Sequence, residues 1–370
     1  MANGRTVAVV TGSRADYGLL RSVMRAIDKH PELELLTFVT GTHLLEPDPT
    51  SEEVAKNFQI SCTITMQRPG ETTRLADANA LGRGISGLAE EFSKRKVDFV
   101  LVLGDRIEAF AAASAASVGG IHLVHMHGGD RAQGIADEAM RHAITKLAHI
   151  HLPASEQSAQ RIVDLGEDPK RIHTVGSPAV DDLDDTPPLS DEKFNELGWP
   201  EIVYLLHPTG GDFDFEQDLA KRLMDLSQES GKVLALYPNH DPGREGILQV
   251  ILESGCEYRE HLPRKDFIGL LQRVRVIVGN SSAGLIECAA LGVRCVNVGP
   301  RQAGRELCAN VIDVPEAKSH QIFPAIARGL AYEIEPVKHP YGDGATGVRT
   351  ANLLATLDMD QYPITKRNTF

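Results

Sequence analysis

Two histidines and an aspartate stand at the ends of neighbouring predicted strands, where they can exchange protons with a bound molecule. His125 and His127 are two residues apart in an apolar run, so both side chains point to one face of a strand. Asp105 follows the preceding apolar run. Neighbouring carboxylates and imidazoles shift one another's pKa values, which suits them to acid and base catalysis. A divalent metal on the two histidines with Asp105 or Asp130 is the competing interpretation. We predict a site without metal or cofactor.

A helix is predicted shortly after these strand residues, and its first turns are rich in charge. Asp137 and Arg141 are four residues apart, as are Glu138 and His142, so each pair shares one helix face. The helix dipole favours carboxylates in the first turn. Two ordinary ion pairs would explain these residues as well. Their nearness to the strand residues leads us to assign five candidate catalytic residues: Asp105, His127, Asp137, Glu138 and Arg141.

A second group of residues is suited to holding phosphate. The stretch from Val276 to Glu287 begins as a β-branched run, breaks at Gly-Asn-Ser-Ser and continues as a helical pattern. A strand, a turn of small residues and a helix start leave backbone N–H groups pointing outward, where an anion binds well. The hydroxyls of Ser281 and Ser282 add donors, and Glu287 can accept from a ribose diol. A helix capped by serine is the plain alternative.

Further candidate anion contacts also follow predicted strands. Arg14 follows the first strand in a loop that lacks GxGxxG, and the chain has no Walker GxxxxGK[ST] motif. Arg301 and Arg305 can face the same phosphates as the two serines, because guanidinium groups contact phosphate oxygens in pairs. A surface residue in a loop is the alternative for Arg14, and a surface salt bridge is the alternative for Arg301 and Arg305. We add His207 and Asn239, at the ends of strands in the second half, to the predicted ligand contacts.

Strand and helix patterns alternate along nearly the whole chain, which predicts an α/β fold with two Rossmann-like, doubly wound parallel sheets facing across a cleft. Ligands of such sheets bind beyond the carboxyl ends of the strands, where the polar clusters fall. We expect domains at 1–180 and 181–345, joined by a linker at 181–198, and a final helix at 346–358 within 346–370 that packs on the first domain. The predicted strands are Thr6–Thr11, Leu33–Thr40, Ile60–Met66, Val97–Leu103, Ile121–His127, His149–Pro153, Arg171–Val175, Ile202–His207, Lys232–Tyr237, Val274–Val278, Arg294–Val298 and Val311–Val314, and a helix is expected over 282–291.

Composition narrows the function classes. The 370 residues are 42% hydrophobic and 24% charged, as in an ordinary globular protein large enough for two domains. A net charge of −13 argues against a nucleic-acid or membrane surface. No apolar run approaches a spanning helix, and the chain starts without a signal-peptide pattern. Five cysteines without a CxxC pair fit a reduced, cytoplasmic protein.

Four motifs, in order, resemble the hydrolysing UDP-N-acetylglucosamine 2-epimerases of sialic-acid and related nonulosonic-acid pathways. They are VTGSRADYG at 10–18, RHAITK at 141–146, GNSS at 279–282 and YGDG at 341–344. The match spans almost the whole chain, and the combination is specific although each motif alone is not. The resemblance implies the GT-B fold, a homodimer or homotetramer, a UDP-sugar substrate and UDP as product.

Residue by residue, the resemblance gives Ser281 and Ser282 to the diphosphate and Glu287 to the ribose, with Arg14 and His207 near the phosphates. Asp105 and Asp137 match acidic catalytic positions, and Arg141 a supporting one. The implied reaction removes the C2 proton, expels UDP to leave a glycal, and adds water to give N-acetylmannosamine.

One departure from the family pattern affects these assignments. Members of the sialic-acid branch carry Glu where this chain has His127, and the loop to Asp137 is one residue longer here. The same reaction on UDP- or GDP-linked N,N'-diacetylbacillosamine, on the way to legionaminic acid, is therefore an alternative. A GT-B glycosyltransferase is the nearest rival function, and a metal-dependent hydrolase and a non-catalytic nucleotide-sugar sensor are further ones.

Overall fold

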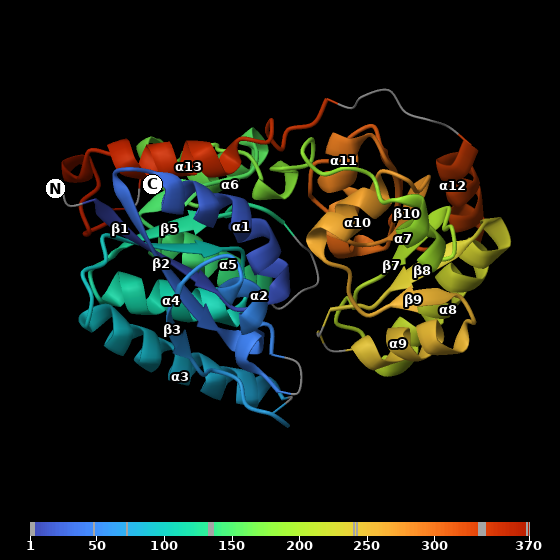
Figure 1. Ribbon diagram of the computed structural model, residues 1–370, viewed down its shortest axis with the longest axis horizontal. Coiled ribbons are helices and arrows are strands. Elements are labelled where there is room, and N and C mark those ends of the chain that lie inside the picture. Colours follow the sequence, from blue (N-terminus) through green and yellow to red (C-terminus); the bar gives the residue numbers. More distant parts are fainter. Residues whose placement is uncertain are drawn as a thin grey trace. The chain divides into compact units, whose positions relative to one another are not determined.

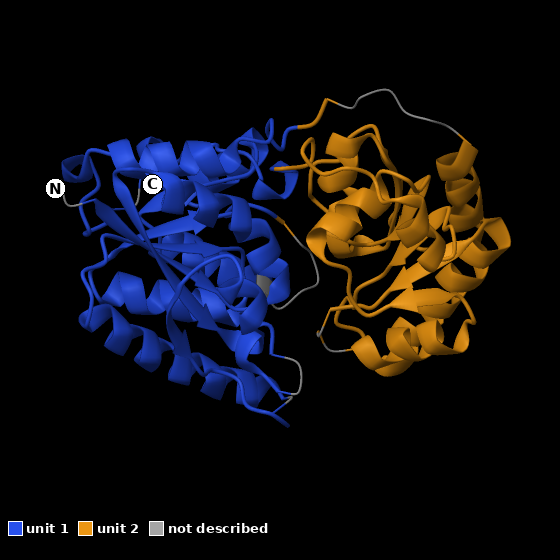
Figure 2. Cartoon of the chain, in the orientation of Figure 1, with its two compact units in different colours: residues 1–130, 137–181, 340–370 blue, residues 131–136, 182–339 orange. Residues whose placement is uncertain are grey.

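The chain folds into two compact units, which Figure 2 shows in different colours. The structure is a computed structural model that describes residues 4–46, 49–71, 73–131, 137–239, 241, 243–331, 338–367 and 369. Unit 1 comprises residues 1–130, 137–181 and 340–370, and unit 2 comprises residues 131–136 and 182–339. Two of the boundaries between the units, after 181 and after 339, lie near the limits at 180 and 345 that the sequence predicted.

Unit 1 is built on a parallel sheet covered by helices (Figure 1). Within the described residues the sheet has six strands in the order β3-β2-β1-β4-β5-β6. The strands are β1 (Arg5–Thr11), β2 (Leu33–Thr40), β3 (Ile60–Ile64), β4 (Phe99–Leu103), β5 (His122–Met126) and β6 (Ile150–Leu152). The helices are α1 (Arg14–Lys29), α2 (Ser51–Ala55), α3 (Arg74–Ser93), α4 (Ile107–Val118), α5 (Asp137–Leu147), α6 (Glu156–Asp164) and α13 (Thr346–Thr356), with short 3-10 turns η1 (Gly41–Leu44), η2 (Pro169–Arg171), η3 (Pro178–Val180) and η6 (Met359–Gln361).

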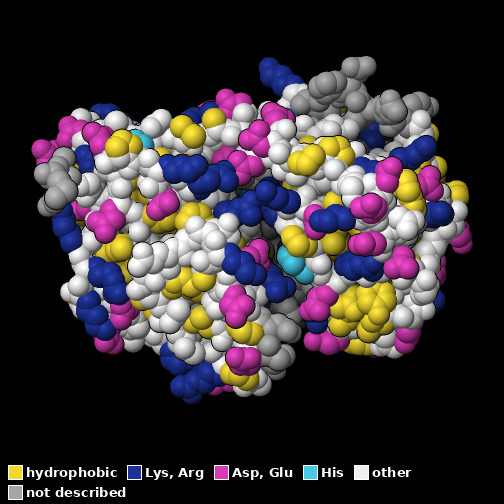
Figure 3. Space-filling model, viewed as in Figure 1, with side chains coloured by type: hydrophobic (Ala, Val, Ile, Leu, Met, Phe, Trp, Pro, Cys, Tyr) yellow, Lys and Arg dark blue, Asp and Glu magenta, His cyan; other side chains and the backbone are white. Residues whose placement is uncertain are grey.

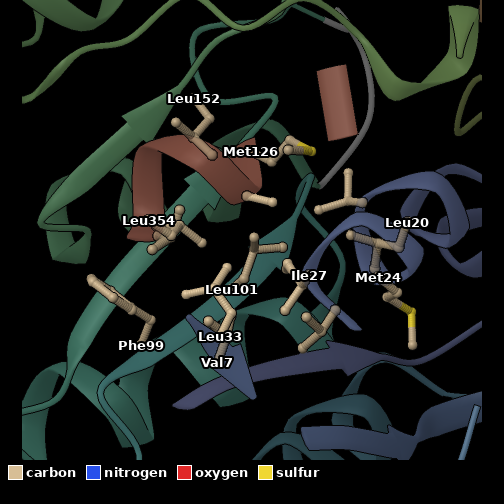
Figure 4. Packing of buried hydrophobic residues seen from close by; sticks show 14 of the residues in the cluster. Val7, Leu20, Met24, Ile27, Leu33, Phe99, Leu101, Met126, Leu152 and Leu354 are labelled. Atoms are coloured by element: carbon tan, nitrogen blue, oxygen red, sulfur yellow. The ribbon is translucent and has the colours of Figure 1, made fainter. Parts of the chain in front are cut away.

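The side chains of β1 divide the core of unit 1 between the two faces of the sheet. Successive residues of a strand point to opposite faces. Val7 and Val9 pack with residues of α1 and α13, including Ile27 and Leu354 (Figure 4). Ala8 and Val10 pack on the other face with residues of α3 and α4. Both faces are therefore buried, which explains the nearly continuous apolar pattern of this strand.

The C-terminal segment belongs to unit 1. Helix α13 lies beside α1, and Arg5 Nη1 donates to the carbonyl of Leu354 at 2.7 Å. Beyond it, the ring of His122 hydrogen-bonds to the Tyr362 carbonyl at 2.7 Å. Lys366 Nζ lies 2.6 Å from the buried carboxylate of Glu167 and donates to the Lys146 carbonyl at 2.8 Å. Burial alone would raise the pKa of Glu167, but hydrogen bonds from His151, Lys146 and Lys366 outweigh it and lower that pKa to about 2.

Unit 2 repeats the same architecture. Its described residues form a parallel sheet of six strands in the order β12-β11-β10-β7-β8-β9. The strands are β7 (Ile202–Leu205), β8 (Val233–Leu236), β9 (Glu257–Arg259), β10 (Val276–Gly279), β11 (Arg294–Val298) and β12 (Val311–Val314). The helices are α7 (Asp191–Glu196), α8 (Phe213–Ser230), α9 (Arg244–Glu253), α10 (Arg264–Leu271), α11 (Glu287–Leu291) and α12 (Ser319–Ala331), with 3-10 turns η4 (Ser282–Gly284) and η5 (Pro300–Gln302). The predicted α/β class with two doubly wound parallel sheets is confirmed.

The structure corrects several local predictions. The helix expected over 282–291 is instead the turn η4 followed by the five-residue α11. The strand expected over 171–175 is reduced to an isolated bridge between His151 and Ile172. The expected linker contains α7, and the sequence patterns missed α9 and β9.

Charged residues of both signs lie at the surface. On the face shown in Figure 3, acidic and basic side chains are interspersed over both units. Among the described residues, no helix is long and apolar enough to cross a membrane.

Candidate functional site

An ion pair joins the end of β4 to helix α5 in unit 1. Asp105 follows Gly104 directly after β4, and its carboxylate pairs with the guanidinium of Arg141. Arg141 Nη1 also donates to the backbone carbonyl of Asp130 at 2.9 Å. Arg141 is buried, with 3% of its surface exposed, whereas 21% of the Asp105 side chain is exposed. The arginine therefore holds the carboxylate in place while leaving part of it accessible.

His127 follows β5 and is fixed from both sides of its ring. Its Nδ1 lies 2.9 Å from Asp130 Oδ2, and its Nε2 lies 3.0 Å from Ser177 Oγ. The other oxygen of Asp130 accepts from the Ser158 hydroxyl at 2.8 Å. His127 has a left-handed backbone with φ of 63°, which is uncommon outside glycine and marks a position held by its surroundings. Asp130 thus contacts His127 with its side chain and Arg141 with its backbone carbonyl.

The order Ser177, His127, Asp130 has the connectivity of a serine-hydrolase triad. A nucleophilic serine must reach its substrate, but Ser177 is fully buried. Its Oγ also accepts from the Ala179 N–H at 3.2 Å, where it caps η3. We conclude that Ser177 and Asp130 orient the ring of His127, and that Ser177 does not attack a substrate.

The helix α5 carries the remaining predicted catalytic residues. Asp137 is the first residue of α5, but its side chain lies outside the described part, so the expected pairing with Arg141 is not described. Glu138 and His142 form the expected contact at 3.6 Å. The ring nitrogens of His125 face Thr145 Oγ1 and the Gly104 carbonyl, and those of His127 face Asp130 and Ser177. Among the described residues, no cluster of three or more His, Cys, Asp or Glu side chains is arranged to hold a metal ion.

In unit 2 the loop after β10 is anchored by Asn280. The side chain of Asn280 accepts from the His207 N–H at 2.7 Å and donates to the His207 carbonyl at 2.8 Å. The backbone carbonyl of Asn280 accepts from the Gln302 side chain at 2.8 Å and from the Arg301 side chain at 3.2 Å. Asn280 is 1% exposed, so these bonds are shielded from water. One buried amide therefore joins the loops that follow β7, β10 and β11.

The turn into this loop requires glycine. Gly279 has φ of 148°, and a Cβ atom there would lie 1.9 Å from the Leu205 carbonyl oxygen. The backbones of β10 and β7 therefore approach more closely at this point than any side chain permits.

His207 is neutral in this environment. Burial lowers its pKa well below the ordinary value, and the nearby charge of Arg301 lowers it further. Its Nδ1 accepts from the Asn239 N–H at 3.2 Å, so the proton of the neutral ring is on Nε2. The structure therefore brings His207, Asn239 and Arg301 together, as three of the predicted contact residues.

The predicted phosphate and ribose residues have partners within unit 2. Ser281 Oγ accepts from the Ala283 N–H at 3.3 Å as the cap of η4, and Ser282 begins that turn. Because a long helix does not start here, we expect a smaller dipole contribution to phosphate binding than the sequence implied. The carboxylate of Glu287 is 3.1 Å from Arg264, which holds it in a nearly buried position.

The other predicted arginines lie at different places. Arg305 Nε donates to the Arg131 carbonyl at 2.7 Å, and both residues belong to unit 2. Arg14 begins α1 in unit 1 and lies 3.9 Å from Glu53, with 42% of its side chain exposed. The loop before Arg14 is shaped by Asp16, which accepts from the Gly12 and Ser13 N–H groups at 2.9 and 2.8 Å.

Sequence reasoning missed the supporting roles of three residues. Asp130 was considered only as a possible metal ligand, and Asn280 stood unassigned inside the GNSS motif, although both follow predicted strands. Ser177 had no such signal, because it is 50 residues from His127 and reaches it only through the fold.

Comparison with known proteins places the chain in a family. Residues 25–355 match the family described as UDP-N-acetylglucosamine 2-epimerase. A UDP-N,N'-diacetylbacillosamine 2-epimerase (hydrolyzing) from Legionella pneumophila is 35% identical over 99% of this chain and 100% of its own length. A UDP-N-acetylglucosamine 2-epimerase from Neisseria meningitidis serogroup B is 34% identical over 88% of each chain.

Solved structures share the fold. The Neisseria meningitidis UDP-GlcNAc 2-epimerase bound to UDP-GlcNAc aligns with a TM-score of 0.78 and 17% identity, over 94% of this chain and 99% of that one. S. aureus MnaA in a co-structure with UDP aligns with a TM-score of 0.80 and 17% identity, over 99% and 100%. These alignments confirm the predicted GT-B fold class. The match over residues 25–355 and the two relatives show that the chain belongs to the UDP-N-acetylglucosamine 2-epimerase family.

Proposed function

We propose that this protein is a hydrolysing 2-epimerase that converts UDP-N-acetylglucosamine and water to N-acetylmannosamine and UDP. In the first step the C2–H and C1–O bonds break, UDP leaves, and a C1=C2 double bond forms. In the second step water adds its oxygen to C1 while a proton returns to C2 on the opposite face. The Legionella relative, which this chain matches over its whole length, is named as a hydrolysing enzyme and supports this choice.

The observation that carries the proposal is the linked arrangement of Asp105, Arg141, Asp130 and His127. Elimination requires a base at C2, and re-addition requires an acid there. Asp105 is a partly accessible carboxylate, and His127 is an imidazole oriented by a second carboxylate, Asp130. We assign the proton transfers to Asp105, His127 and Asp137, with Glu138 in support, and the orientation of Asp105 to Arg141.

We assign UDP binding mainly to unit 2. Ser281 and Ser282 would donate to the diphosphate, and Glu287 would accept from the ribose. Donors held in place before the reaction stabilise the negative charge that grows on the leaving diphosphate without having to reorganise. His207, Asn239, Arg301 and Arg305 would complete the contacts of unit 2, and Arg14 is proposed as a further phosphate contact.

A second candidate is the same reaction on UDP-N,N'-diacetylbacillosamine. It is favoured by the Legionella relative and by His127. The change of sugar alters the substituents at C4 and C6 and leaves the reacting C1 and C2 unchanged. The mechanism above therefore serves both substrates.

The test is an incubation with each UDP-sugar in the absence of any acceptor, with UDP and sugar products quantified together. We expect one UDP for each free 2-epimer, and the larger kcat/KM identifies the substrate. Accumulation of the epimeric UDP-sugar without UDP release would contradict the hydrolysing assignment. A requirement for an acceptor would indicate a glycosyltransferase.

We also propose that the protein assembles as a homodimer or homotetramer, as the resemblance implies. Light scattering after size exclusion should give a mass of two or four times 40.2 kDa. A single-chain mass across the working concentration range would refute it.

A further inference from the structure

His125 is a fully buried histidine that the proposed mechanism does not use. It lies on β5, with 0% of its surface exposed. Its Nδ1 is 3.1 Å from Thr145 Oγ1 on α5, and its Nε2 is 2.8 Å from the Gly104 carbonyl. The ring therefore connects helix α5 to the turn that follows β4.

The two contacts specify the protonation of the ring. A carbonyl can only accept, so Nε2 must carry the hydrogen that it shares with Gly104. In the neutral ring Nδ1 is then an acceptor, and the hydroxyl of Thr145 donates to it. Burial lowers the pKa of His125 to about 3, so the ring is neutral near pH 7. In a protonated ring Nδ1 would carry a hydrogen, and the Thr145 hydroxyl would have to accept it instead of donating.

The turn that His125 contacts is the one that presents Asp105. Gly104 has φ of 78°, and its N–H donates to the Met126 carbonyl at 3.0 Å. Its N–H is thus bound by the backbone of β5, and its carbonyl by the His125 side chain on the same strand. Both polar groups of the residue before Asp105 are fixed by β5.

Helix α5 reaches this turn at two points. Arg141 and Thr145 are four residues apart, so they lie on the same face of the helix. Arg141 pairs directly with Asp105, and Thr145 acts on Gly104 through His125. Two adjacent residues of the turn are therefore held by one helix face.

The packing leaves little freedom around the ring. A Cβ atom on Gly128 would lie 2.9 Å from His125 Nδ1 and 3.1 Å from Thr145 Oγ1. The glycine lets the backbone after β5 pass close over this hydrogen bond. His151, His127 and Asp130 are the other titratable groups whose charges act on the ring.

We infer that His125 is a positioning residue for Asp105: its neutral ring, held by Thr145, donates to the Gly104 carbonyl and fixes the turn from which the Asp105 carboxylate meets Arg141. The catalytic consequence rests on the proposed role of Asp105, whereas the hydrogen-bond arrangement does not. The two parts are therefore tested separately.

The arrangement is tested by nitrogen NMR on the full chain labelled with ¹⁵N-histidine. We expect His125 to show a protonated Nε2 and an unprotonated Nδ1 near pH 7, and Thr145→Val to shift the Nδ1 resonance. The assignment comes from comparison with His125→Gln. A hydrogen on Nδ1, or a ring unaffected by Thr145→Val, would overturn the inference whether or not the protein turns over a UDP-sugar.

The consequence is tested by turnover in a matched set of variants. In His125→Leu the Gly104 carbonyl loses its donor, and we expect kcat to fall on the order of 100-fold with KM little changed, because a displacement of about 1 Å in a catalytic group has that effect. His125→Gln supplies an amide N–H near the Nε2 position and should recover part of kcat. His149→Leu is the control, since His149 is also a buried histidine but contacts the Leu123 N–H and the Ile364 carbonyl instead.

The pattern of these results separates positioning from general stability. The inference is supported if kcat is low in His125→Leu and partly restored in His125→Gln, whatever the order of the melting temperatures of these variants. Equal loss of kcat in His125→Leu and His149→Leu variants of equal melting temperature would overturn it. If the wild type shows no epimerase activity while the NMR pattern is as expected, the proposed function fails and the hydrogen-bond arrangement stands.

Discussion

Arg141 links Asp105 to Asp130: its guanidinium pairs with the Asp105 carboxylate and donates to the Asp130 carbonyl at 2.9 Å. These residues come from the turn after β4, the loop after β5 and helix α5. Because Asp130 also holds the ring of His127, two of the proposed proton-transfer residues, Asp105 and His127, share one support. The geometry of the site thus depends on the two donor groups of a single buried guanidinium.

Replacing Arg141 tests this dependence. Lysine keeps the charge but offers its donors from one nitrogen, so it cannot reach both partners in the same way. A hydrogen bond to a charged group contributes about 1.5–3 kcal/mol, which corresponds to roughly a 10- to 150-fold loss of kcat/KM for Arg141→Lys and more for Arg141→Met. UDP release measures the loss, and thermal unfolding shows whether the variants are folded. Wild-type turnover in folded Arg141→Met would remove this residue from the mechanism.

Asp105→Asn tests the proposed acid and base chemistry. The amide preserves the size of the side chain but cannot take a proton from C2, so we expect turnover to fall by about 10²–10⁴-fold. UDP affinity should be unchanged, because we assign UDP mainly to unit 2. Calorimetric titration with UDP measures the second quantity. The exposed Asp28→Asn on α1 is the control, and equal turnover of the two variants would refute the assignment of Asp105.

Asn280→Ala tests the UDP side of the site. The substitution leaves the N–H and carbonyl of His207 without their buried side-chain partners, and each unsatisfied group costs about 1–3 kcal/mol. We expect the Kd for UDP to rise by roughly tenfold or more as the loop relaxes. Asn297→Ala is a matched control, because Asn297 is a buried asparagine on β11 that contacts Asp313 instead. A larger effect in the control than in Asn280→Ala would contradict the anchoring role.

His149 makes stability depend on pH. Burial lowers its pKa from 6.5 to about 4, helped by the nearby charges of His122, Lys366 and Arg171. Below pH 6.5 His149 binds a proton in the unfolded chain but not in the folded chain. Its contribution to the free energy of unfolding is therefore fully present above pH 6.5 and is lost as the pH falls toward 4. His149→Asn keeps an acceptor for Leu123 and removes the titration. The free energy of unfolding in urea is measured from pH 7.5 to 4.5 for both proteins. Its slope against pH should be smaller in His149→Asn than in the wild type, by up to about 1.4 kcal/mol per pH unit. Parallel curves would contradict the prediction.

Much of the fold could be predicted because its signals are local. The apolar run of β4, its glycine and the following Asp105 mark the end of a parallel strand, and the same logic located His127 and the loop at Asn280. The parallel sheets and the polar residues at strand ends were predicted from the alternation of strand and helix patterns. These predictions did not depend on which side chains contact one another in the folded protein.

The partners of the site residues could not be predicted, because they depend on contacts between distant parts of the chain. Helix spacing indicated that Arg141 shares a helix face with Asp137, but it gave no sign of the pairing with Asp105, 36 residues away. Ser177 reaches His127 across 50 residues, and Glu287 is held by Arg264. The helix expected from Ser282 is divided by a turn at Leu285 and Ile286 into η4 and α11, a break that the local helical pattern did not indicate.

The most direct test of the proposed function is proton NMR of the reaction in heavy water, with UDP-N-acetylglucosamine and its N,N'-diacetylbacillosamine counterpart as substrates. Removal of the C2 proton followed by addition of solvent predicts free 2-epimeric sugar carrying deuterium at C2, formed together with UDP. Product that retains the original hydrogen at C2, or UDP release with unchanged configuration at C2, would contradict elimination and re-addition at this site.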